Sequence, residues 1–381
     1  NMLSDNKSNL PPGLYHISGV AGVGMSALAE VMLYAGYKVS GSDREIDRGK
    51  TPEVVQKLVR NGLTVYPQDG SAILHETKGL IVSTAIEADN PEIAAAGKFS
   101  VPVLHRAKAL AMLTSAGKTC IAVSGTCGKS TVTGMIGFVF EKAGLDPVVV
   151  NGARVVNWMT DTASGSVRWG KSGIWIVEAD ESDRSFVEFD PDWVVLTNAS
   201  ADHFGIEETL SLFKQFSNKA RHGVISGIYP SSLLNNFSPS VEKNGSSFLY
   251  ERNTYRISLP GKHNAENALL AVAFCKKFGV PEETIKHALA EFKGIHRRLE
   301  RVGEVRGINV IDDYAHNPAK IKAAWQAVSP FCRNVHAVWR PHGYGPLRKI
   351  MDDLCEVLNE IWKRGDSIIL LPVYDAGGTA D

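Results

Sequence analysis

The chain has 381 residues, of which 44% are hydrophobic and 22% charged, and its formal net charge at neutral pH is zero. This length suits two or three domains with their own cores. The charge balance argues against a nucleic-acid partner, which usually needs a basic surface. No apolar run approaches the roughly 18–20 residues that cross a bilayer, so no membrane partner is expected.

The cysteines point to a reducing compartment. There are five, scattered along the chain without a CxxC spacing. Such a pattern disfavours a disulfide framework or a zinc site. No charged-then-apolar leader precedes a small-residue cleavage site, so we expect a cytoplasmic protein.

The first unit predicted from the pattern covers residues 1–114. It reads as strand, glycine-rich turn, helix and strand, in the segments LYHIS, GVAGVG, MSALAEVMLYAGY and KVSGSD. Met25, Leu28, Met32 and Leu33 recur at the spacing of a helix face. Further strands are expected at 79–84 and 101–105, and the alternation of strands and helices predicts a parallel α/β domain.

A second unit is predicted over residues 115–297 and a third over 298–381. The second begins with the strand TCIAVS, continues into GTCGKST and a helix, and then has two apolar strands, GIWIVEAD and DWVVLTNAS, that end in polar residues. Functional groups of parallel sheets collect at such carboxyl ends. The third should alternate the strand INVIDDYAH, a helix from Pro318, the strand NVHAVWRPH, a helix from Leu347 and the strand DSIILLPVY.

The strongest candidate site lies between the first strand and the first helix of the second unit. Backbone N–H groups of such a loop, with the helix N-terminus behind it, bind phosphate oxygens. A strict phosphate loop has glycine five residues before Gly128, where this chain has Val123, so this is a shortened variant. A surface turn that matches by chance is the alternative. The loop consists of Gly125, Thr126, Cys127, Gly128, Lys129, Ser130 and Thr131.

Acidic residues follow the next two strands of the same unit. Glu178, Asp180, Glu181 and Asp183 come after GIWIV, and the pair Asp202-His203 comes after DWVVLTNAS. Mg²⁺ prefers oxygen ligands and keeps several waters, so one or two carboxylates beside bound phosphates are enough. A solvated loop, with His203 as a helix cap, is the simpler interpretation.

The glycine-rich turn of the first unit is a weaker signal. It leads a strand into a helix and could bind a diphosphate, and Asp43 ends the next strand as in a dinucleotide-binding fold. Its glycines follow the pattern GxxGxG, whereas an NAD site has GxGxxG. A tight turn without a ligand stays open.

Together these segments resemble the Mur ligases, which build the peptide stem of the bacterial cell wall. The stretch GVAGVGMSALAEVMLYAGYKVSGSD is similar to the family's UDP-binding start, and STAIEADNPEIAAA and VPVLHRAKALAML are similar to its next two segments. SGTCGKST resembles the phosphate loop, while VEADESDRSF and LTNASADHF resemble the metal-side segments. GKHNAENALLAVA looks like the adenine-side helix, and HRRLERVG with DDYAHNPAKI looks like the hinge and opening strand of the third domain.

The resemblance implies a three-domain α/β fold with a Rossmann-like UDP-binding domain, a central P-loop-type ATPase domain with a mainly parallel sheet, and a C-terminal Rossmann-like domain. The last should be incomplete here, since the family's third domain continues past VYDAGG. ATP and Mg²⁺ are the implied cofactors. ATP would contact the loop 125–131 and also Asn264, Asn267, Arg298, Asp313 and His316.

The resemblance also assigns the remaining roles. Lys129, Glu178, His203 and Arg298 would be catalytic, and Ser130, Glu178 and His203 would be the metal ligands. The UDP portion would be held by Gly22, Val23, Gly24, Met25, Ser42, Asp43, Ser83 and Arg106, and the amino-acid side by His342, Tyr344 and Arg348.

The implied activity joins L-alanine to the carboxylate of UDP-N-acetylmuramate through an acyl phosphate, in a monomer or weak homodimer. The family's HRYTRTR pattern is replaced by HGYGPLR, so Gly343 and Pro346 stand where arginines are typical. This departure keeps open a related ligase that attaches a ready-made tripeptide to the same nucleotide. From other classes, a dinucleotide-dependent oxidoreductase and an inactive binding protein with the ligase fold are the alternatives. Ser200 stands where an acid is frequent, and Lys219 is either a carbamoylated or a plain surface lysine.

Overall fold

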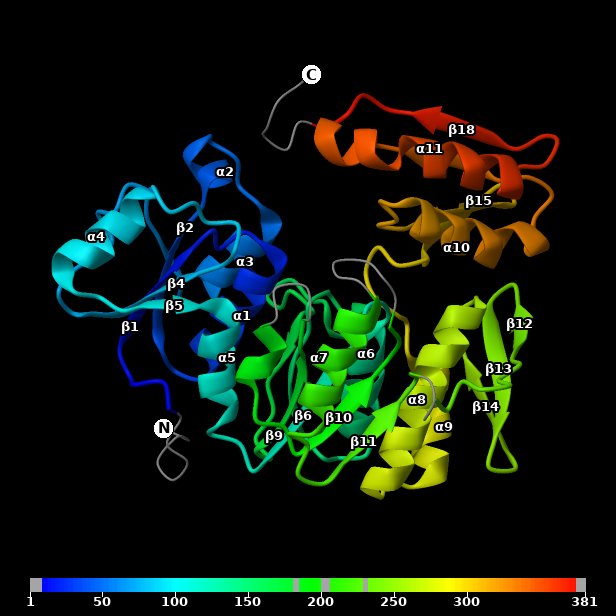
Figure 1. Ribbon diagram of the computed structural model, residues 1–381, viewed down its shortest axis with the longest axis horizontal. Coiled ribbons are helices and arrows are strands. Elements are labelled where there is room, and N and C mark those ends of the chain that lie inside the picture. The colour runs from blue at the N-terminus through cyan, green and yellow to red at the C-terminus, as the bar shows by residue number, and fades with distance from the viewer. Residues whose placement is uncertain (1–8, 181–184, 200–205, 229–231, 375–381) are drawn as a thin grey trace. The chain divides into compact units, whose positions relative to one another are not determined.

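The computed structural model describes residues 9–180, 185–199, 206–228 and 232–374 (Figure 1). The chain forms two compact units, one from residues 1–237 and 266–294 and the other from residues 238–265 and 295–381. Helix α8 (Lys262–Phe278) begins in the second unit and continues into the first. The three domains expected from the sequence stay a prediction.

The first sheet of unit 1 is five-stranded and parallel, in the order β3-β2-β1-β4-β5. The strand order reverses at β1, so the ends of β1 and β4 flank the crevice where open α/β sheets bind ligands. The strands are β1 (Leu14–Ser18), β2 (Lys38–Ser42), β3 (Thr64–Val65), β4 (Thr77–Val82) and β5 (Val103–His105). The helices are α1 (Val23–Tyr34), α2 (Arg44–Asp47), α3 (Glu53–Arg60), α4 (Pro91–Phe99) and α5 (Arg106–Thr114). The predicted parallel α/β arrangement is confirmed.

The second sheet of unit 1 is six-stranded, in the order β11-β10-β6-β9-β7-β8, and only the β7–β8 pair is antiparallel. The predicted mainly parallel sheet is confirmed. Its strands are β6 (Thr119–Ser124), β7 (Val148–Val150), β8 (Val167–Arg168), β9 (Ile174–Glu178), β10 (Trp193–Leu196) and β11 (Gly223–Ser226). The remaining elements of the unit are α6 (Lys129–Lys142), α7 (Ile206–Ser217), α9 (Glu282–Glu291), and the 3-10 helices η1 (Val156–Trp158) and η2 (Ser185–Glu188).

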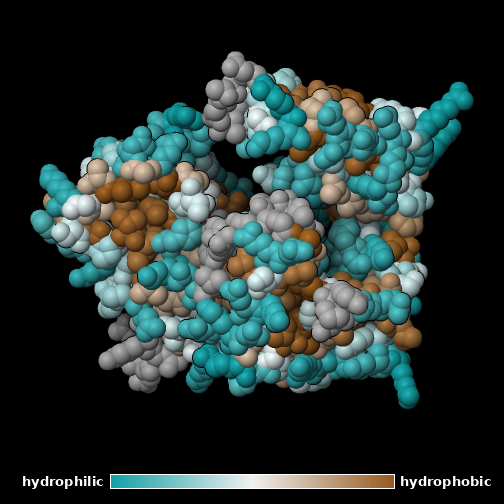
Figure 2. Space-filling model, viewed as in Figure 1, coloured by the Kyte–Doolittle hydropathy of each residue, from teal (hydrophilic) through white to brown (hydrophobic). Residues whose placement is uncertain are grey.

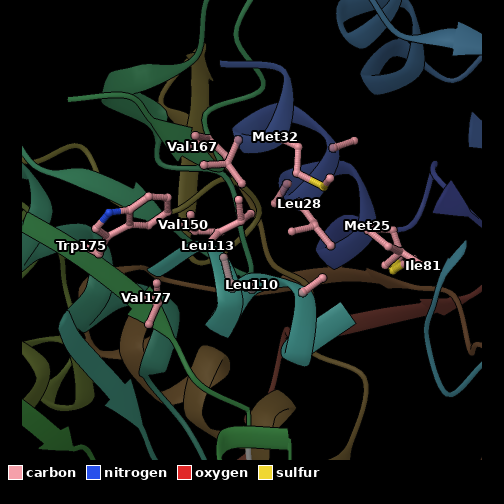
Figure 3. Packing of buried hydrophobic residues seen from close by; sticks show 14 of the residues in the cluster. Met25, Leu28, Met32, Ile81, Leu110, Leu113, Val150, Val167, Trp175 and Val177 are labelled. Atoms are coloured by element: carbon pink, nitrogen blue, oxygen red, sulfur yellow. The ribbon is translucent and has the colours of Figure 1, made fainter. Parts of the chain in front are cut away.

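The two sheets of unit 1 share a hydrophobic core. Met25, Leu28 and Met32 on the buried face of α1 lie in one cluster with Leu110 of α5 and with strand residues of the second sheet such as Trp175 (Figure 3). Leu28 is 1% exposed. The helix face predicted from the spacing of these residues is confirmed, and it serves as the seam between the sheets.

Polar contacts reinforce this seam. Side chains of α1 and α3, and of the residue after α3, bind the backbone of the loop at residues 161–164. Ser164 N–H donates to Glu30 Oε1 at 3.2 Å, and the Ser164 hydroxyl donates to the other carboxylate oxygen. The other donors are Lys57, Arg60 and Asn61, which bind the carbonyl oxygens of Ala163, Asp161 and Thr162. This loop therefore donates hydrogen bonds to α1 and accepts them from α3 and the residue after it.

The described residues of unit 2 form three small sheets. The antiparallel strands β12 (Ser240–Glu242), β13 (Gly245–Tyr250) and β14 (Asn253–Ile257) form one sheet. An antiparallel hairpin of β15 (Glu300–Val305) and β16 (Ile308–Asp312) forms the second, and the parallel pair β17 (His336–Trp339) and β18 (Ser367–Leu370) forms the third. The helices are α10 (Pro318–Val328), η3 (Ser329–Phe331) and α11 (Tyr344–Ile361).

Two expectations for unit 2 need correction. The sequence did not predict β15, which pairs antiparallel with β16 ahead of the first helix. The last helix begins at Tyr344, three residues before the expected Leu347. Gly343, at φ 84°, forms its N-cap, and Pro346 lies in the first helical turn, where a missing N–H costs no helical hydrogen bond.

None of the described helices is suited to cross a membrane. Among residues 9–180, 185–199, 206–228 and 232–374, no helix is both long enough and apolar enough to cross a bilayer. The face of the molecule in Figure 2 carries hydrophilic side chains over much of its area, with hydrophobic patches between them.

The buried Glu30 carboxyl makes stability depend on pH in a testable way. Burial raises the pKa of Glu30 above 4.5, partly offset by its hydrogen bonds to Ser164. The folded state therefore binds the proton more tightly than the unfolded state, and this residue favours folding more as the pH falls from neutral toward 4.5.

We expect Glu30→Gln to remove this dependence. Between pH 7 and pH 5, measured by denaturant unfolding, the wild type should gain free energy of unfolding relative to the variant. The difference between two proteins cancels the titration of all other groups. A difference that is the same at both pH values would contradict the assignment.

Candidate active site

The phosphate-loop sequence connects β6 to α6 at the carboxyl edge of the second sheet. Strand β6 is buried from Cys120 to Ser124, because sheet and helices cover both of its faces. Gly128 caps α6 at φ 85°, in the left-handed region that favours glycine. A Cβ at Gly128 would clash with the Asn267 side chain of α8. The structure thus brings Asn267, expected on the adenine side, against the loop.

The strands on both sides of β6 end beside this loop. In the parallel pairing of β6 and β9, Glu178 lies opposite Val123. In the pairing of β6 and β10, Leu196 lies opposite Ser124. The residues that follow β9 and β10 therefore reach the same edge as the loop, as predicted for functional groups at the ends of parallel strands.

Lys129 is largely buried within the loop that it belongs to. Its Nζ donates to Gly125 O at 2.8 Å and lies 3.5 Å from Asp180 Oδ1. The side chain is 13% exposed. A lysine ammonium beside a helix N-terminus is suited to a phosphate group.

Ser130 and Glu178, two of the expected metal ligands, contact adjacent residues. Asn151 Nδ2 donates to Ser130 O at 2.9 Å, and Gly152 N donates to Glu178 Oε2 at 2.8 Å. A hydroxyl and a carboxylate are the hard oxygen donors that Mg²⁺ prefers, so this pair fits the ion. The third expected ligand, His203, lies outside the described residues, as do Glu181, Asp183, Ser200 and Asp202. Within the described ranges, no group of three His, Cys, Asp or Glu side chains is placed to hold a metal by itself.

Asn151 and Gly152 are not among the site residues predicted from the sequence. They follow β7, whose carboxyl end lies beside β9 in the sheet. The available signal was the one used for the other strands, namely polar or small residues directly after the apolar run VVV.

The glycine-rich turn of the first sheet is held by backbone contacts to the end of β2. Gly19 N and Val20 N donate to Ser42 O at 2.9 and 3.0 Å. Asp43 accepts from Ala21 N through one oxygen, at 3.0 Å, and from Glu45 N through the other, at 2.9 Å. Ser42 and Asp43 therefore shape the turn, whatever it binds.

Arg106, the first residue of α5, lies against this turn. A Cβ added to Gly24 would stand 3.1 Å from Arg106 Nε. The guanidinium lies near the N-terminus of α1, which includes Val23, Gly24 and Met25 with Gly22 as N-cap, and both carry positive charge of the kind that suits an anion. Ser83 follows β4 at the same edge of the sheet, and its hydroxyl accepts from Ala85 N at 3.3 Å.

Further expected nucleotide residues lie in unit 2. Asp313 Oδ2 accepts from Leu299 N at 2.8 Å. Burial raises the pKa of the Asp313 carboxyl, and hydrogen bonds from the backbone of Leu299 and Ala315, with the charge of Arg298, partly offset this. Arg298 stands between Arg297 and Leu299, which both have left-handed φ angles of 58° and 47°. This backbone is strained for residues with a Cβ, and Asp313 stabilises it.

Other residues of unit 2 are placed as follows. His316 Nδ1 lies 3.0 Å from Tyr314 O, and Asn264 Nδ2 donates to Pro260 O at 2.7 Å. On the expected amino-acid side, the His342 ring stacks on Tyr374 with 5.0 Å between ring centroids. Tyr344 and Arg348 are one turn apart at the start of α11, so they share a helix face.

The contact between Gly152 and Glu178 gives a direct test of this site. A methyl group at Gly152 would stand 2.8 Å from the Glu178 carboxylate atoms, so the carboxylate would have to move. Changes next to a metal ligand typically cost about 10–100-fold in metal affinity. We expect Gly152→Ala to weaken binding of Mn²⁺ with ADP by about tenfold, measured by titration calorimetry or electron paramagnetic resonance.

The matched control is Gly97→Ala in α4, where an added Cβ meets no atom within 4 Å. Gly97→Ala should bind the metal and nucleotide as the wild type does. Equal affinities for the two alanine variants would show that Gly152 does not position Glu178.

Two parts of the chain match known protein families. Residues 14–118 match the Mur ligase family, catalytic domain, and residues 297–371 match the Mur ligase, glutamate ligase domain. The UDP-N-acetylmuramate–L-alanine ligase of Gluconobacter oxydans is 34% identical over 407 residues, which cover 96% of this chain and 82% of the relative. That of Myxococcus xanthus is 34% identical over 411 residues, covering 97% and 84%.

Solved structures share the fold. The UDP-N-acetylmuramate-alanine ligase MurC of Thermotoga maritima superposes with a TM-score of 0.78 at 24% identity, covering 94% of this chain and 90% of that one. A murein peptide ligase of Psychrobacter arcticus gives a TM-score of 0.69 at 20% identity, covering 94% and 95%. With relatives of this identity over nearly its whole length, and with the α/β fold of these ligases, the chain belongs to the Mur ligase family.

Proposed function

We propose that this chain is an ATP-dependent ligase that joins L-alanine to the carboxylate of UDP-N-acetylmuramate and releases ADP and phosphate, as a step of peptidoglycan precursor synthesis. The observation that carries the proposal is the loop 125–131, with Lys129 beside Asp180 and with Glu178 at the end of the adjacent strand. The names of relatives 34% identical over 96–97% of the chain support the choice of substrates.

An amide does not form directly from a carboxylate and an amine, because hydroxide is a poor leaving group. Transfer of the γ-phosphoryl group of ATP to the carboxylate gives an acyl phosphate and ADP. The amine then attacks the acyl carbon, and inorganic phosphate leaves. In such reactions the protein mainly positions the reactants and offsets negative charge.

Residues at the carboxyl edge of the second sheet would take part in this reaction. The N-terminus of α6, from Gly128 onward, would bind the phosphates of ATP through backbone N–H groups. The Lys129 ammonium offsets charge between the phosphates, and Asn267 faces the adenine side. Ser130, Glu178 and His203 would hold Mg²⁺, which, when bound, offsets charge on the transferring phosphoryl group.

The first sheet would bind the UDP portion. The N-terminus of α1 and the Arg106 guanidinium offer positive charge to a diphosphate, while Ser42 and Asp43 keep the turn in shape. In unit 2, we assign Arg298, Asp313, His316 and Asn264 to the nucleotide, and His342, Tyr344 and Arg348 to the amino acid. We expect the enzyme to act in the cytoplasm as a monomer or weak dimer, on small molecules and without nucleic acid or membrane.

Phosphate release with a panel of amines tests the proposal. In the presence of UDP-N-acetylmuramate, ATP and Mg²⁺, we expect release to depend on L-alanine. Phosphate release that needs the tripeptide L-alanyl-γ-D-glutamyl-diaminopimelate would favour the related peptide ligase. Gly343 and Pro346, which replace the family's arginines at the start of α11, are the reason for this alternative. Loss of the dependence on UDP-N-acetylmuramate would refute the ligase assignment.

Lys129→Ala tests the role of the loop. Removal of one charge-stabilising donor typically costs about 100–1,000-fold in rate. We expect at least about a hundredfold loss of acyl-phosphate formation, measured as phosphate release, with unchanged affinity for UDP-N-acetylmuramate measured by calorimetry. Lys214→Ala, at an exposed position of α7, is the control. ATP turnover at the wild-type rate in Lys129→Ala would exclude Lys129 from the reaction.

A further inference from the structure

Thr197 and Asn198, the two residues that follow β10, are hydrogen-bonded to the backbone of the phosphate loop. The Thr197 hydroxyl donates to Cys127 O at 2.6 Å. Asn198 Nδ2 donates to the same carbonyl at 2.9 Å, and Asn198 Oδ1 accepts from Cys127 N at 2.9 Å. The Asn198 carboxamide thus pairs with both polar groups of Cys127, as a neighbouring strand would.

Backbone contacts extend this pairing on both sides of Cys127. Thr126 N donates to Asn198 O at 3.0 Å, and Thr197 N donates to Ser124 O at 2.9 Å. Gly125 lies so close to Thr197 that a Cβ there would clash with the Thr197 hydroxyl. The two residues after β10 therefore lie alongside the loop from Ser124 to Cys127.

This arrangement accounts for how a shortened loop keeps its shape. The position where a strict phosphate loop has its first glycine is Val123, which is fully buried within β6. The loop is accordingly brief, and side chains from the adjacent strand bind its central peptide groups. The N–H groups of Thr126 and Cys127 donate to Asn198. The phosphate oxygens would therefore be bound by N–H groups at the amino end of α6, from Gly128 onward.

We propose that Thr197 and Asn198 are positioning residues for the phosphates of ATP, acting through the Cys127 peptide. They hold the loop in one conformation before the nucleotide arrives, so that binding does not have to order it. This inference rests on the proposed function, since it takes ATP as the nucleotide of this site. A purely structural role would instead lower the stability of the protein and leave the affinity of the folded protein for nucleotide unchanged.

Three variants separate these roles. Asn198 lies partly exposed, so Asn198→Ala should fold, and it removes two hydrogen bonds to Cys127. Thr197→Val keeps the branched shape without the hydroxyl, and Thr197→Ser keeps the hydroxyl. Since each hydrogen bond contributes roughly a few-fold in an equilibrium constant, we expect Asn198→Ala to raise the dissociation constant of ADP with Mg²⁺ by about tenfold. Thr197→Val should raise it by about fivefold, and Thr197→Ser should stay within about twofold of the wild type.

The measurement is titration calorimetry with ADP and Mg²⁺ and, separately, with UDP-N-acetylmuramate, whose affinity should not change in any variant. Asn218→Ala, at an exposed asparagine after α7, is the control. Wild-type ADP affinity in both Asn198→Ala and Thr197→Val, or equal losses in Thr197→Val and Thr197→Ser, would overturn the inference alone. A wild-type protein that does not bind ADP would overturn it together with the proposed function.

Discussion

The hydrogen-bond register of three parallel strands is the constraint on which the candidate active site depends. With Val123 opposite Glu178 and Ser124 opposite Leu196, the ends of β9, β6 and β10 reach one edge of the sheet. The loop after β6 cannot shift along this edge without breaking ladder bonds on both sides. Its position is therefore set by the buried sheet, whose apolar strands are the most rigid part of such a fold.

The polar side chains at this edge of the sheet are oriented by hydrogen bonds to neighbouring backbone groups. Lys129 is bonded to Gly125 O and lies near Asp180, Glu178 is bonded to Gly152 N, and Asn198 is bonded to Cys127. Charge and hydrogen-bonding groups that are already oriented lose little entropy on binding, and they offset charge in the transition state without further rearrangement. In the proposed function, the same contacts that stabilise the loop would prepare it for a phosphate chain.

The same strand–turn–helix arrangement occurs in both sheets of unit 1. In each sheet a buried strand leads through a glycine-containing turn into a helix, β1 into α1 and β6 into α6, and each turn is bonded to the end of a neighbouring strand. Ser42 and Asp43 do this in the first sheet, as Thr197 and Asn198 do in the second. Helix α1 also packs its apolar face against the second sheet, so the two candidate anion sites lie on a shared core (Figure 3).

Local patterns in the sequence determined much of this protein. The spacing of Met25, Leu28 and Met32, the apolar runs LYHIS and TCIAVS, and the strand–GTCGKST–helix order predicted the α/β elements and the loop, because periodicity and glycine content are local properties. Only the tertiary structure decided which distant residues meet. Gly152 against Glu178, Asn198 against Cys127 and Glu30 against Ser164 are far apart in the chain, and the β15–β16 hairpin and the early start of α11 depend on strand pairing and turn geometry. The contacts of Gly152 and Asn198 follow from strand order and register, and that of Glu30 follows from helix packing, none of which a single segment encodes.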